Sequence, residues 1–256
     1  MIRTCQAAME RRTAAMTVPD PGREMTRSFA RNDRWTYRPS FFDGAVGLCP
    51  VPSEHREAEQ GHGDMTDPGL DEASALLQRA YPLLHDEFMR TIAVVHPITH
   101  ARVPSSSLCS NSANSTLSPP GILLTVTRPS ATAEAFVHEM AHHKLFAAGV
   151  TTDHGGGILH ETDKLAYSAA VERDRPIPAI MHAAYSFLHM VAFDLAMIEA
   201  GLCGDEPRQL LSGNLRVSRD TLQQLQRHAV PTAAGRVFLS ELADWGNRLF
   251  ARADAV

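Results

Sequence analysis

Lysine is nearly missing from this chain, which has only two lysines (Lys144 and Lys164) against 22 arginines in 256 residues. An excess of positive charge is missing as well, because the formal net charge at pH 7 is -5. A protein that holds nucleic acid by its charge needs a basic footprint, so we expect no nucleic-acid partner. The arginine bias, together with abundant alanine, is typical of a GC-rich bacterial genome.

Cysteine is scarce too, and no two cysteines form a Cys-x-x-Cys pair. The four lie far apart, at Cys5, Cys49, Cys109 and Cys203. With 44% hydrophobic and 21% charged residues, a chain of this length can bury a core without a disulfide scaffold. We therefore expect a globular protein in a reducing, cytoplasmic compartment.

Long hydrophobic runs are also absent. The longest charge-free apolar stretch, 176–193, includes His182, Ser186 and His189 and begins with two prolines, which a membrane span tolerates poorly. The N-terminus lacks the continuous apolar core of a secretory signal. We expect a buried helix over this stretch and no membrane partner.

Hydrophobic periodicity indicates the organisation of the chain. The arginine-rich residues 1–40 predict a flexible N-terminal tail, and residues 41–256 predict a single catalytic domain. A helical pattern begins at Leu70, and a Ser/Asn/Pro-rich loop covers residues 104–120. Strands are predicted over 91–95 and 122–126, and further helices over 130–148, 176–201, 205–229 and 233–253. This pattern predicts an α+β fold, mostly α-helical, with a small sheet packed over the helix at 130–148.

That helix carries His138-Glu139-Met140-Ala141-His142, an HExxH motif. Histidines at positions i and i+4 lie on one face of a helix, so both imidazoles can bind one metal ion. Glu139 lies to the side, where it can reach a metal-bound water or orient a ligand. We predict that His138 and His142 are metal ligands and that Glu139 is the catalytic residue.

A catalytic metal site needs a third protein ligand as well as an open position. The downstream candidates are His160, Glu161, Glu172 and His182. Glu161 lies 19 residues past His142, close to where a thermolysin-like peptidase places its glutamate, and spacing alone favours it. His182 lies 40 residues past His142, in a long helix that can pack beside the motif helix, so the choice stays open.

Two segments, 138–149 and 167–190, resemble a bacterial family of HExxH-containing proteins that modify ribosomally synthesised peptides. The likeness rests on Lys144-Leu145 after the motif, on the Arg-Asp-Arg-Pro segment at 173–176, and on His182, Tyr185 and Phe187 in one helix. It covers about residues 105–195. The chain departs from the family at Val171-Glu172-Arg173, where a Pro-Trp-Arg run is frequent.

The resemblance implies an Fe(II)- and 2-oxoglutarate-dependent peptide β-hydroxylase. In that family the three histidines at positions 138, 142 and 182 are iron ligands, and Glu139 orients a ligand or acts as a base. Arg175, or Arg173, is then the candidate partner of the 2-oxoglutarate carboxylate, because a guanidinium binds carboxylates bidentately. The implied substrate is a peptide or an amino-acyl residue, such as a precursor peptide in natural-product biosynthesis.

Two other functions compete with this one. A zincin-type metallopeptidase would hold zinc on His138, His142 and Glu161, with Glu139 activating water. A non-enzymatic peptide-binding protein with a vestigial site is the third. Imidazole suits both zinc and iron, so the sequence does not name the metal. In either enzyme a peptide could add to the strand at 122–126 as an extra strand.

Overall fold

The computed structural model describes residues 35–51, 59–115 and 120–256. Most of the tail predicted over residues 1–40 lies outside these ranges. The last residues of that segment lie against the sheet: Trp35 packs with Ala93 and Val94, and the backbone of Thr36 pairs with that of Leu48.

Helices make up most of the described fold. They are the short 3-10 helix η1 (Phe42–Gly44), α3 (Pro68–Ala80), α4 (Pro82–Thr91), α5 (Pro129–Ala147), α6 (Ile177–Glu199), α7 (Glu206–His228) and α8 (Ala233–Ala253). The four helices predicted downstream of residue 129 are confirmed, each end falling within two residues of its predicted place.

The strands form one small mixed sheet and one hairpin. The strands are β1 (Gly47–Leu48), β2 (Gln60–His62), β3 (Val94–His100), β4 (Ser112–Ser115), β5 (Gly121–Thr125), β6 (Leu165–Ser168) and β7 (Arg173–Pro176). In the sheet the order is β1-β3-β5-β4, with β2 paired to the far end of β3. Strands β1 and β5 run parallel to β3, whereas β4 runs antiparallel to β5. The fold is therefore mixed, with many helices and a small sheet, which agrees with the predicted α+β class.

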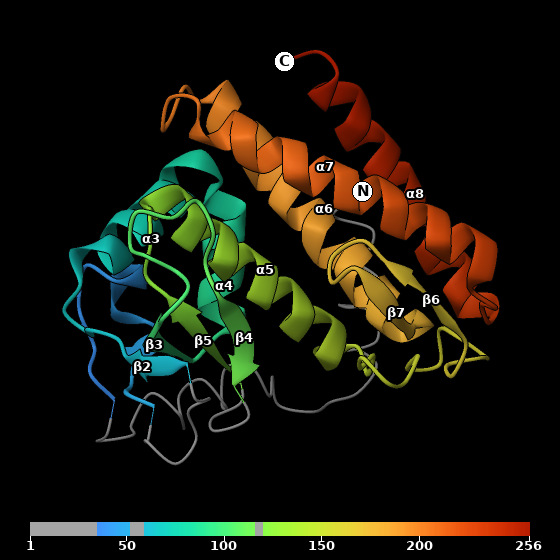
Figure 1. The fold of residues 1–256 in the computed structure, drawn as a ribbon, viewed down its shortest axis with the longest axis horizontal. Helices are drawn as coiled ribbons and strands as arrows, with labels where there is room; N and C mark the ends of the chain where they lie inside the picture. Colours follow the sequence, from blue (N-terminus) through green and yellow to red (C-terminus); the bar gives the residue numbers. More distant parts are fainter. Residues whose placement is uncertain (1–34, 52–58, 116–119) are drawn as a thin grey trace, which may run out of the picture.

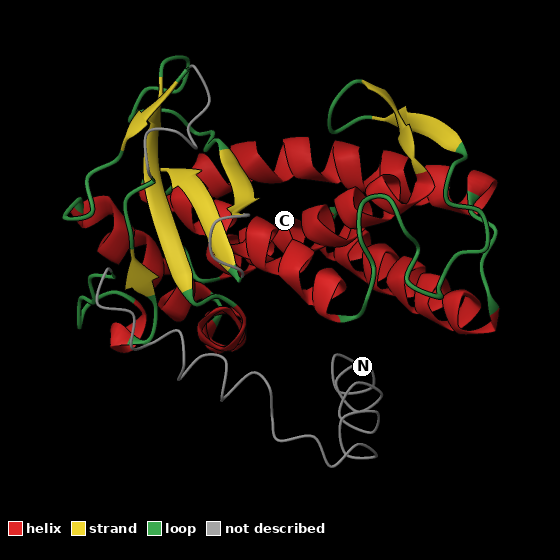
Figure 2. Ribbon diagram, turned by 90° about the horizontal axis from the view of Figure 1, so that it is seen from below, coloured by secondary structure: helices red, strands yellow, loops and turns green. Residues whose placement is uncertain are grey.

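Helix α5 lies in the middle of the molecule (Figure 1). It packs against α3, α4 and the strands β4 and β5 on one side, and against α6 on the other. The helices α6 and α7 form the most extensive helix pair, and the β6–β7 hairpin packs on them. The sheet and the hairpin lie toward opposite ends of the helical layer (Figure 2).

Two hydrophobic cores flank α5. Phe136, Val137 and Met140 share the first core with residues of α3, α4 and β5. Leu145 belongs to the second core, which α6, α7 and α8 build. Because its side chains serve both cores, α5 is held on nearly all sides, and the residues of its motif have fixed positions.

Helix α6 is the apolar stretch noted in the sequence. It is long and apolar enough to cross a membrane by length and composition, but 83% of its most apolar window is buried inside the fold. A core helix of a soluble protein has this character, and the buried helix predicted here is confirmed.

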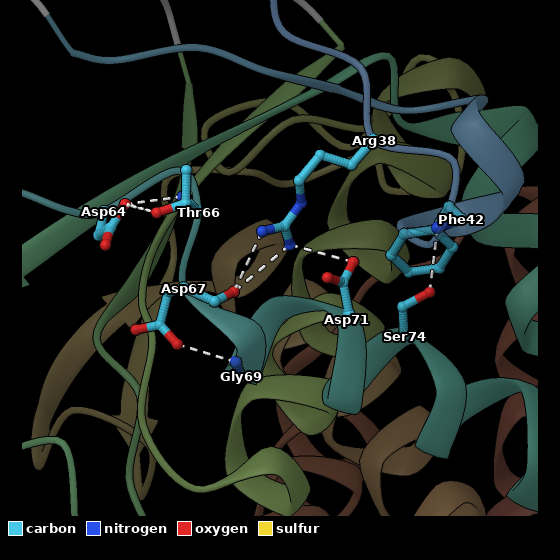
Figure 3. A network of polar contacts seen from close by, with 8 residues as sticks. All are labelled: Arg38, Phe42, Asp64, Thr66, Asp67, Gly69, Asp71 and Ser74. Carbon is cyan, nitrogen blue, oxygen red and sulfur yellow. Dashed lines mark hydrogen bonds and ion pairs between the residues drawn. The ribbon is translucent and has the colours of Figure 1, made fainter.

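Helix α3 begins at an N-cap residue, Asp67, which Figure 3 shows together with its neighbours. The Asp67 side chain accepts a hydrogen bond of 2.8 Å from the Gly69 N–H, and Pro68 occupies the first turn, where its missing N–H costs nothing. Arg38 reaches the same cap: one guanidinium nitrogen lies 3.0 Å from Asp71 Oδ1, and both terminal nitrogens donate to the Asp67 carbonyl oxygen. These bonds fix the first described residues to the domain.

The structure differs from the sequence expectation in three places. The helical pattern from Leu70 is broken at Tyr81, because the residue before Pro82 disfavours helical backbone. The strand predicted over 91–95 begins at Val94 instead and continues through Pro97. The polar loop at 104–120 contains β4, which forms an end of the sheet, so β5 is an interior strand and offers no edge to a peptide.

Candidate metal centre

His138 and His142 project from one face of α5, as the motif spacing predicts. Their Nε2 atoms lie 3.1 Å apart, and their rings meet edge to face. Two imidazoles that bind one tetrahedral metal with bonds of 2.0–2.1 Å hold their nitrogens about 3.3 Å apart. The separation in the protein is therefore close to the one that a shared metal ion requires.

The third histidine of the group comes from α6. The Nδ1 atoms of His142 and His182 lie 2.9 Å apart, and the two rings are stacked with centroids 5.1 Å apart. The Nε2 atom of His182 lies 3.2 Å from the backbone oxygen of Val150. The packing of α6 on α5 thus joins residues 40 positions apart in sequence.

Apolar side chains surround the three rings. Phe187 meets the His138 ring edge on, at 5.5 Å between centroids, and Phe146 lies 4.9 Å from the His182 ring. The Met190 sulfur is 3.1 Å from His138 Nδ1. His182 is buried, whereas the His138 side chain is 22% exposed, so the pair on α5 is the part of the group that solvent and substrate can reach.

The histidines of this group are neutral at pH 7. Burial, with a smaller contribution from the nearby His182, lowers the pKa of His138 to about 4. Burial likewise lowers the pKa of His182 to about 4, and it holds the pKa of His142 well below its usual value, with the neighbouring histidines adding to the effect. A neutral imidazole keeps one nitrogen lone pair, which is the form that binds a metal.

Glu139 is buried beside the histidines. Its Oε1 accepts a hydrogen bond of 2.7 Å from Ser112 Oγ on β4 and lies 3.8 Å from His138 Nε2. Burial raises the pKa of Glu139 to about 7, although the bond from Ser112 acts in the opposite direction. The carboxyl group can therefore both hold and release a proton near neutral pH, as a general acid or base does.

The other predicted third ligands do not join this group. Glu161 and His160 are exposed in the segment after α5, and Glu172 is exposed between β6 and β7. Within the described residues, the side chain of Glu161 makes no hydrogen bond or ion pair. The structure brings His182 to the motif and leaves Glu161 outside it.

The two candidate arginines lie on β7. Arg175 is half-buried and pairs with Ala166 of β6, and Arg173 is exposed and pairs with Ser168. Strand β7 leads directly into α6, and His182 follows in the second turn of that helix. Arg175 therefore lies just before the start of α6, and within the described residues no hydrogen bond or ion pair joins either arginine to the three histidines.

The three imidazoles are suitable metal ligands, although their nitrogen atoms do not all point to one common position. Three neutral imidazoles lie together, and imidazole is a ligand for zinc, iron and copper. Within the described ranges, no group of three or more His, Cys, Asp or Glu side chains is already arranged around a single metal position. The reason is visible in the contacts, since His142 turns a different nitrogen toward each of its two neighbours.

A buried acidic pair lies one helical turn from His138, and the sequence analysis missed it. Glu134 of α5 and Asp194 of α6 both accept hydrogen bonds from the Asn214 amide of α7. All three side chains are buried. The sequence does contain a signal for this pair, because Asp194 is the one charged residue between Ile177 and Glu199 in an otherwise apolar helix.

No protein-family model matches the sequence, and the comparison with curated proteins gave no match. The choice of a function therefore rests on the motif residues and on the geometry of this group.

Proposed function

We propose that this protein is a metal-dependent oxygenase that hydroxylates a ribosomal peptide or an amino-acyl substrate in the bacterial cytoplasm, within natural-product biosynthesis. Its metal would be Fe(II) and its co-substrate 2-oxoglutarate. The observation that carries the proposal is the position of His182, which meets the HExxH pair, whereas Glu161 stays exposed. The peptide-hydroxylase resemblance needs this histidine at the site, and the peptidase alternative needs Glu161.

The residues that would hold the ion are His138 and His142, with His182 against them. Bound Fe(II) would supply the oxidation of a C–H bond with O₂ and 2-oxoglutarate, a reaction that protein side chains do not perform. The protein contributes neutral nitrogen donors, kept neutral by burial. It also contributes the apolar side chains of Phe146, Phe187 and Met190, which cover part of the rings.

Arg175 is the residue that we propose for the 2-oxoglutarate carboxylate. It is half-buried and lies at the entrance to α6, the helix that carries His182. A guanidinium binds a carboxylate through two parallel hydrogen bonds. Arg173 is on the same face of β7 but is exposed, which makes it the weaker candidate and a suitable control.

We propose that the substrate peptide binds along the edge of the sheet. Strand β4 ends the order of the described strands, and Ser112 ties it to Glu139 of α5. A second bond joins sheet and helix, because His143 Nε2 donates to the Gly121 oxygen of β5 at 3.0 Å. We infer that the small sheet covers the motif helix and that an extended peptide could add along β4 and pass the histidines.

A zinc metallopeptidase remains the second candidate because of Glu139. Its buried carboxyl lies 3.8 Å from His138 Nε2, and its pKa is about 7. A peptidase needs such a group to take a proton from a metal-bound water. The hydroxylase does not need that step, so the role of Glu139 separates the two reactions.

Anaerobic reconstitution tests the proposal. The purified chain is loaded with Fe(II) and then mixed with O₂, 2-oxoglutarate and a candidate peptide. We expect succinate and a peptide heavier by about 16 Da, the mass of one oxygen atom. Arg175→Ala should raise the 2-oxoglutarate concentration needed for half-maximal rate at least about tenfold, since a carboxylate would lose its bidentate partner. Arg173→Ala should change it little. Peptide cleavage with zinc, and no succinate with iron, would establish the peptidase instead.

A further inference from the structure

Asn114 of β4 carries a buried hydrogen-bonding atom that the rest of the described chain does not satisfy. Its Oδ1 atom is shielded from solvent and, within the described residues, has no hydrogen-bond partner. The residue as a whole is half-buried, so its amide is not sealed inside a core. A buried polar atom without a partner costs free energy, and most such atoms in native proteins have one. The amide of Asn114 is therefore placed to bind a group from outside the described chain.

The register of the sheet gives the direction of the Asn114 side chain. Asn114 pairs with Ile122 across the β4–β5 ladder, and Ser112 pairs with Leu124. Directly paired residues, and residues two apart on one strand, send their side chains to the same face of a sheet. Ile122 and Leu124 pack in the core that includes Phe136 of α5. Asn114 therefore points to the face of the sheet that α5 covers.

Two contacts between sheet and helix give the level of Asn114 along α5. Ser112, two residues before Asn114, donates to the Glu139 carboxyl group. Gly121, which lies opposite the last residue of β4, has its carbonyl oxygen 3.0 Å from His143 Nε2. Asn114 lies between these two contacts. Its amide is thus directed toward the part of α5 that carries the HExxH motif.

An extended peptide that adds to the edge of β4 would meet this amide. Strand β4 ends the order of the described strands, so its outer edge can accept another strand. A peptide residue that pairs directly with Asn114 would send its side chain to the same face of the sheet. The Cβ atoms of such a pair lie about 4.5–5.5 Å apart, so polar ends of the two side chains can form hydrogen bonds.

The chemistry of the Asn114 amide limits the side chain that fits opposite it. An amide has one acceptor atom and one donor group, and a second primary amide offers the complementary pair. A carboxylate only accepts and a lysine only donates, so each would serve half of the amide. An aliphatic side chain would leave the Asn114 oxygen buried without a partner, at the full cost of that desolvation.

We propose that Asn114 is a specificity-determining residue for the peptide substrate, and that its amide pairs with the side chain of an asparagine or glutamine placed opposite it along β4. This inference rests on the proposed function, of which it names the substrate class: peptides with an amide side chain near the residue that is modified. The role of Asn114 is in binding alone. A site built to form a hydrogen bond rejects the analogue that lacks the group, because its own polar atoms are then left unpaired.

Peptide selection on the metal-free, full-length chain is the first test. A phage-displayed library of random heptapeptides is selected on the unaltered chain and on Asn114→Ala. We expect enrichment of asparagine or glutamine at one peptide position with the unaltered chain and none with the variant. Asn114→Asp keeps an acceptor and loses the donor, so it should enrich serine, lysine or arginine there instead. Ala113→Asn is the matched control, because Ala113 is exposed on the opposite face of β4, and it should keep the original preference.

Isothermal titration with one selected heptapeptide measures the pair itself. Replacement of the peptide's amide residue by alanine should weaken binding to the unaltered chain by about 10–100-fold, the cost of a buried polar atom left unpaired. The same replacement should change binding to Asn114→Ala by less than about twofold, because the partner is already gone. An equal loss of affinity in both proteins would overturn the proposal.

These outcomes are distinct from those of the proposed function. If the selected heptapeptides show no preferred amide position, or if none binds, the inference is wrong, even where the iron-loaded protein forms succinate with a peptide. If the amide preference depends on Asn114 but no peptide yields succinate with Fe(II), the inference stands and the hydroxylase proposal fails.

Discussion

Ser112 and Glu139 are joined by a hydrogen bond of 2.7 Å that ties the end strand of the sheet to the glutamate of the HExxH motif. The two residues lie 27 positions apart in the sequence. The bond fixes the direction of the Glu139 carboxyl group, whose other neighbour in the group is His138 Nε2. Any reaction that uses Glu139 thus depends on how β4 is placed.

The substitution Glu139→Gln separates the two candidate reactions. In a zinc peptidase the glutamate takes the proton of the metal-bound water, so turnover should fall by about 10²–10⁴-fold. In the proposed hydroxylase no water needs to lose a proton, and we expect measurable succinate formation from the variant. The measurement is the initial rate with Fe(II) and with Zn(II), at equal metal content. Ser112→Ala is the matched control, since it frees the carboxyl group without removing it.

The metal ligands are tested by stoichiometry. His138→Ala and His142→Ala should each lose tight metal binding, because each removes one of two helix-borne donors. Glu161→Ala should keep one equivalent, since Glu161 is exposed and away from the group. Elemental analysis after gel filtration measures the content. If a double variant of His138 and His142 still bound one equivalent of metal, the metal would bind elsewhere. Loss of the metal from Glu161→Ala would instead favour the peptidase.

Some parts of this architecture could be predicted from the sequence because they depend on local signals. Helices α5 to α8 have long apolar periodicity and clear ends, so their bounds are confirmed within two residues. The i, i+4 spacing likewise places His138 and His142 together. Strand β4 was missed because Ser-Ala-Asn-Ser contains none of the β-branched or aromatic residues that mark strands.

Other parts depend on tertiary packing, which a local pattern does not contain. Spacing favoured Glu161 as the partner of the motif, whereas the family resemblance implied His182, and it is the packing of α6 on α5 that brings His182 against His142. The acidic pair of Glu134 and Asp194 has the same origin, because three helices must meet before the Asn214 amide can bridge it. A residue 40 or 60 positions away becomes a neighbour through the fold alone.

This acidic pair predicts how stability depends on pH. Burial raises the pKa of Glu134 from 4.5 to about 7, and burial together with the nearby Glu134 raises that of Asp194 well above its usual value. A raised pKa in the folded state gives stability that is fully present below the unfolded value and is lost as pH rises through the folded value. The free energy of unfolding should therefore fall as the pH rises from about 4.5 through about 7.

The variant Asp194→Asn tests this dependence. It removes Asp194, one of the two acids whose pKa is raised in the folded state, so the loss of stability with rising pH should become smaller. Urea unfolding at a series of pH values measures the slope. Asp153→Asn, at an exposed acid in the segment after α5, is the control and should leave the slope unchanged. An unaltered slope in Asp194→Asn would mean that the pair does not share its protons.

Two helical glycines give a paired prediction of opposite sign. Gly235 lies in the first turn of α8, where an added Cβ would come within 1.9 Å of the Ile158 carbonyl oxygen. This backbone also accepts a hydrogen bond from the Thr232 N–H, so it cannot easily move. Gly235→Ala should lower the free energy of unfolding by about 1–3 kcal/mol, the usual cost of overpacking a close contact.

Gly213 is exposed inside α7 with nothing near its Cβ position, and Gly213→Ala should raise the free energy of unfolding by about 0.5–1 kcal/mol. Urea unfolding of both variants at one pH measures the two changes. Equal effects of the two substitutions would contradict the packing of α8 on the turn at Ile158.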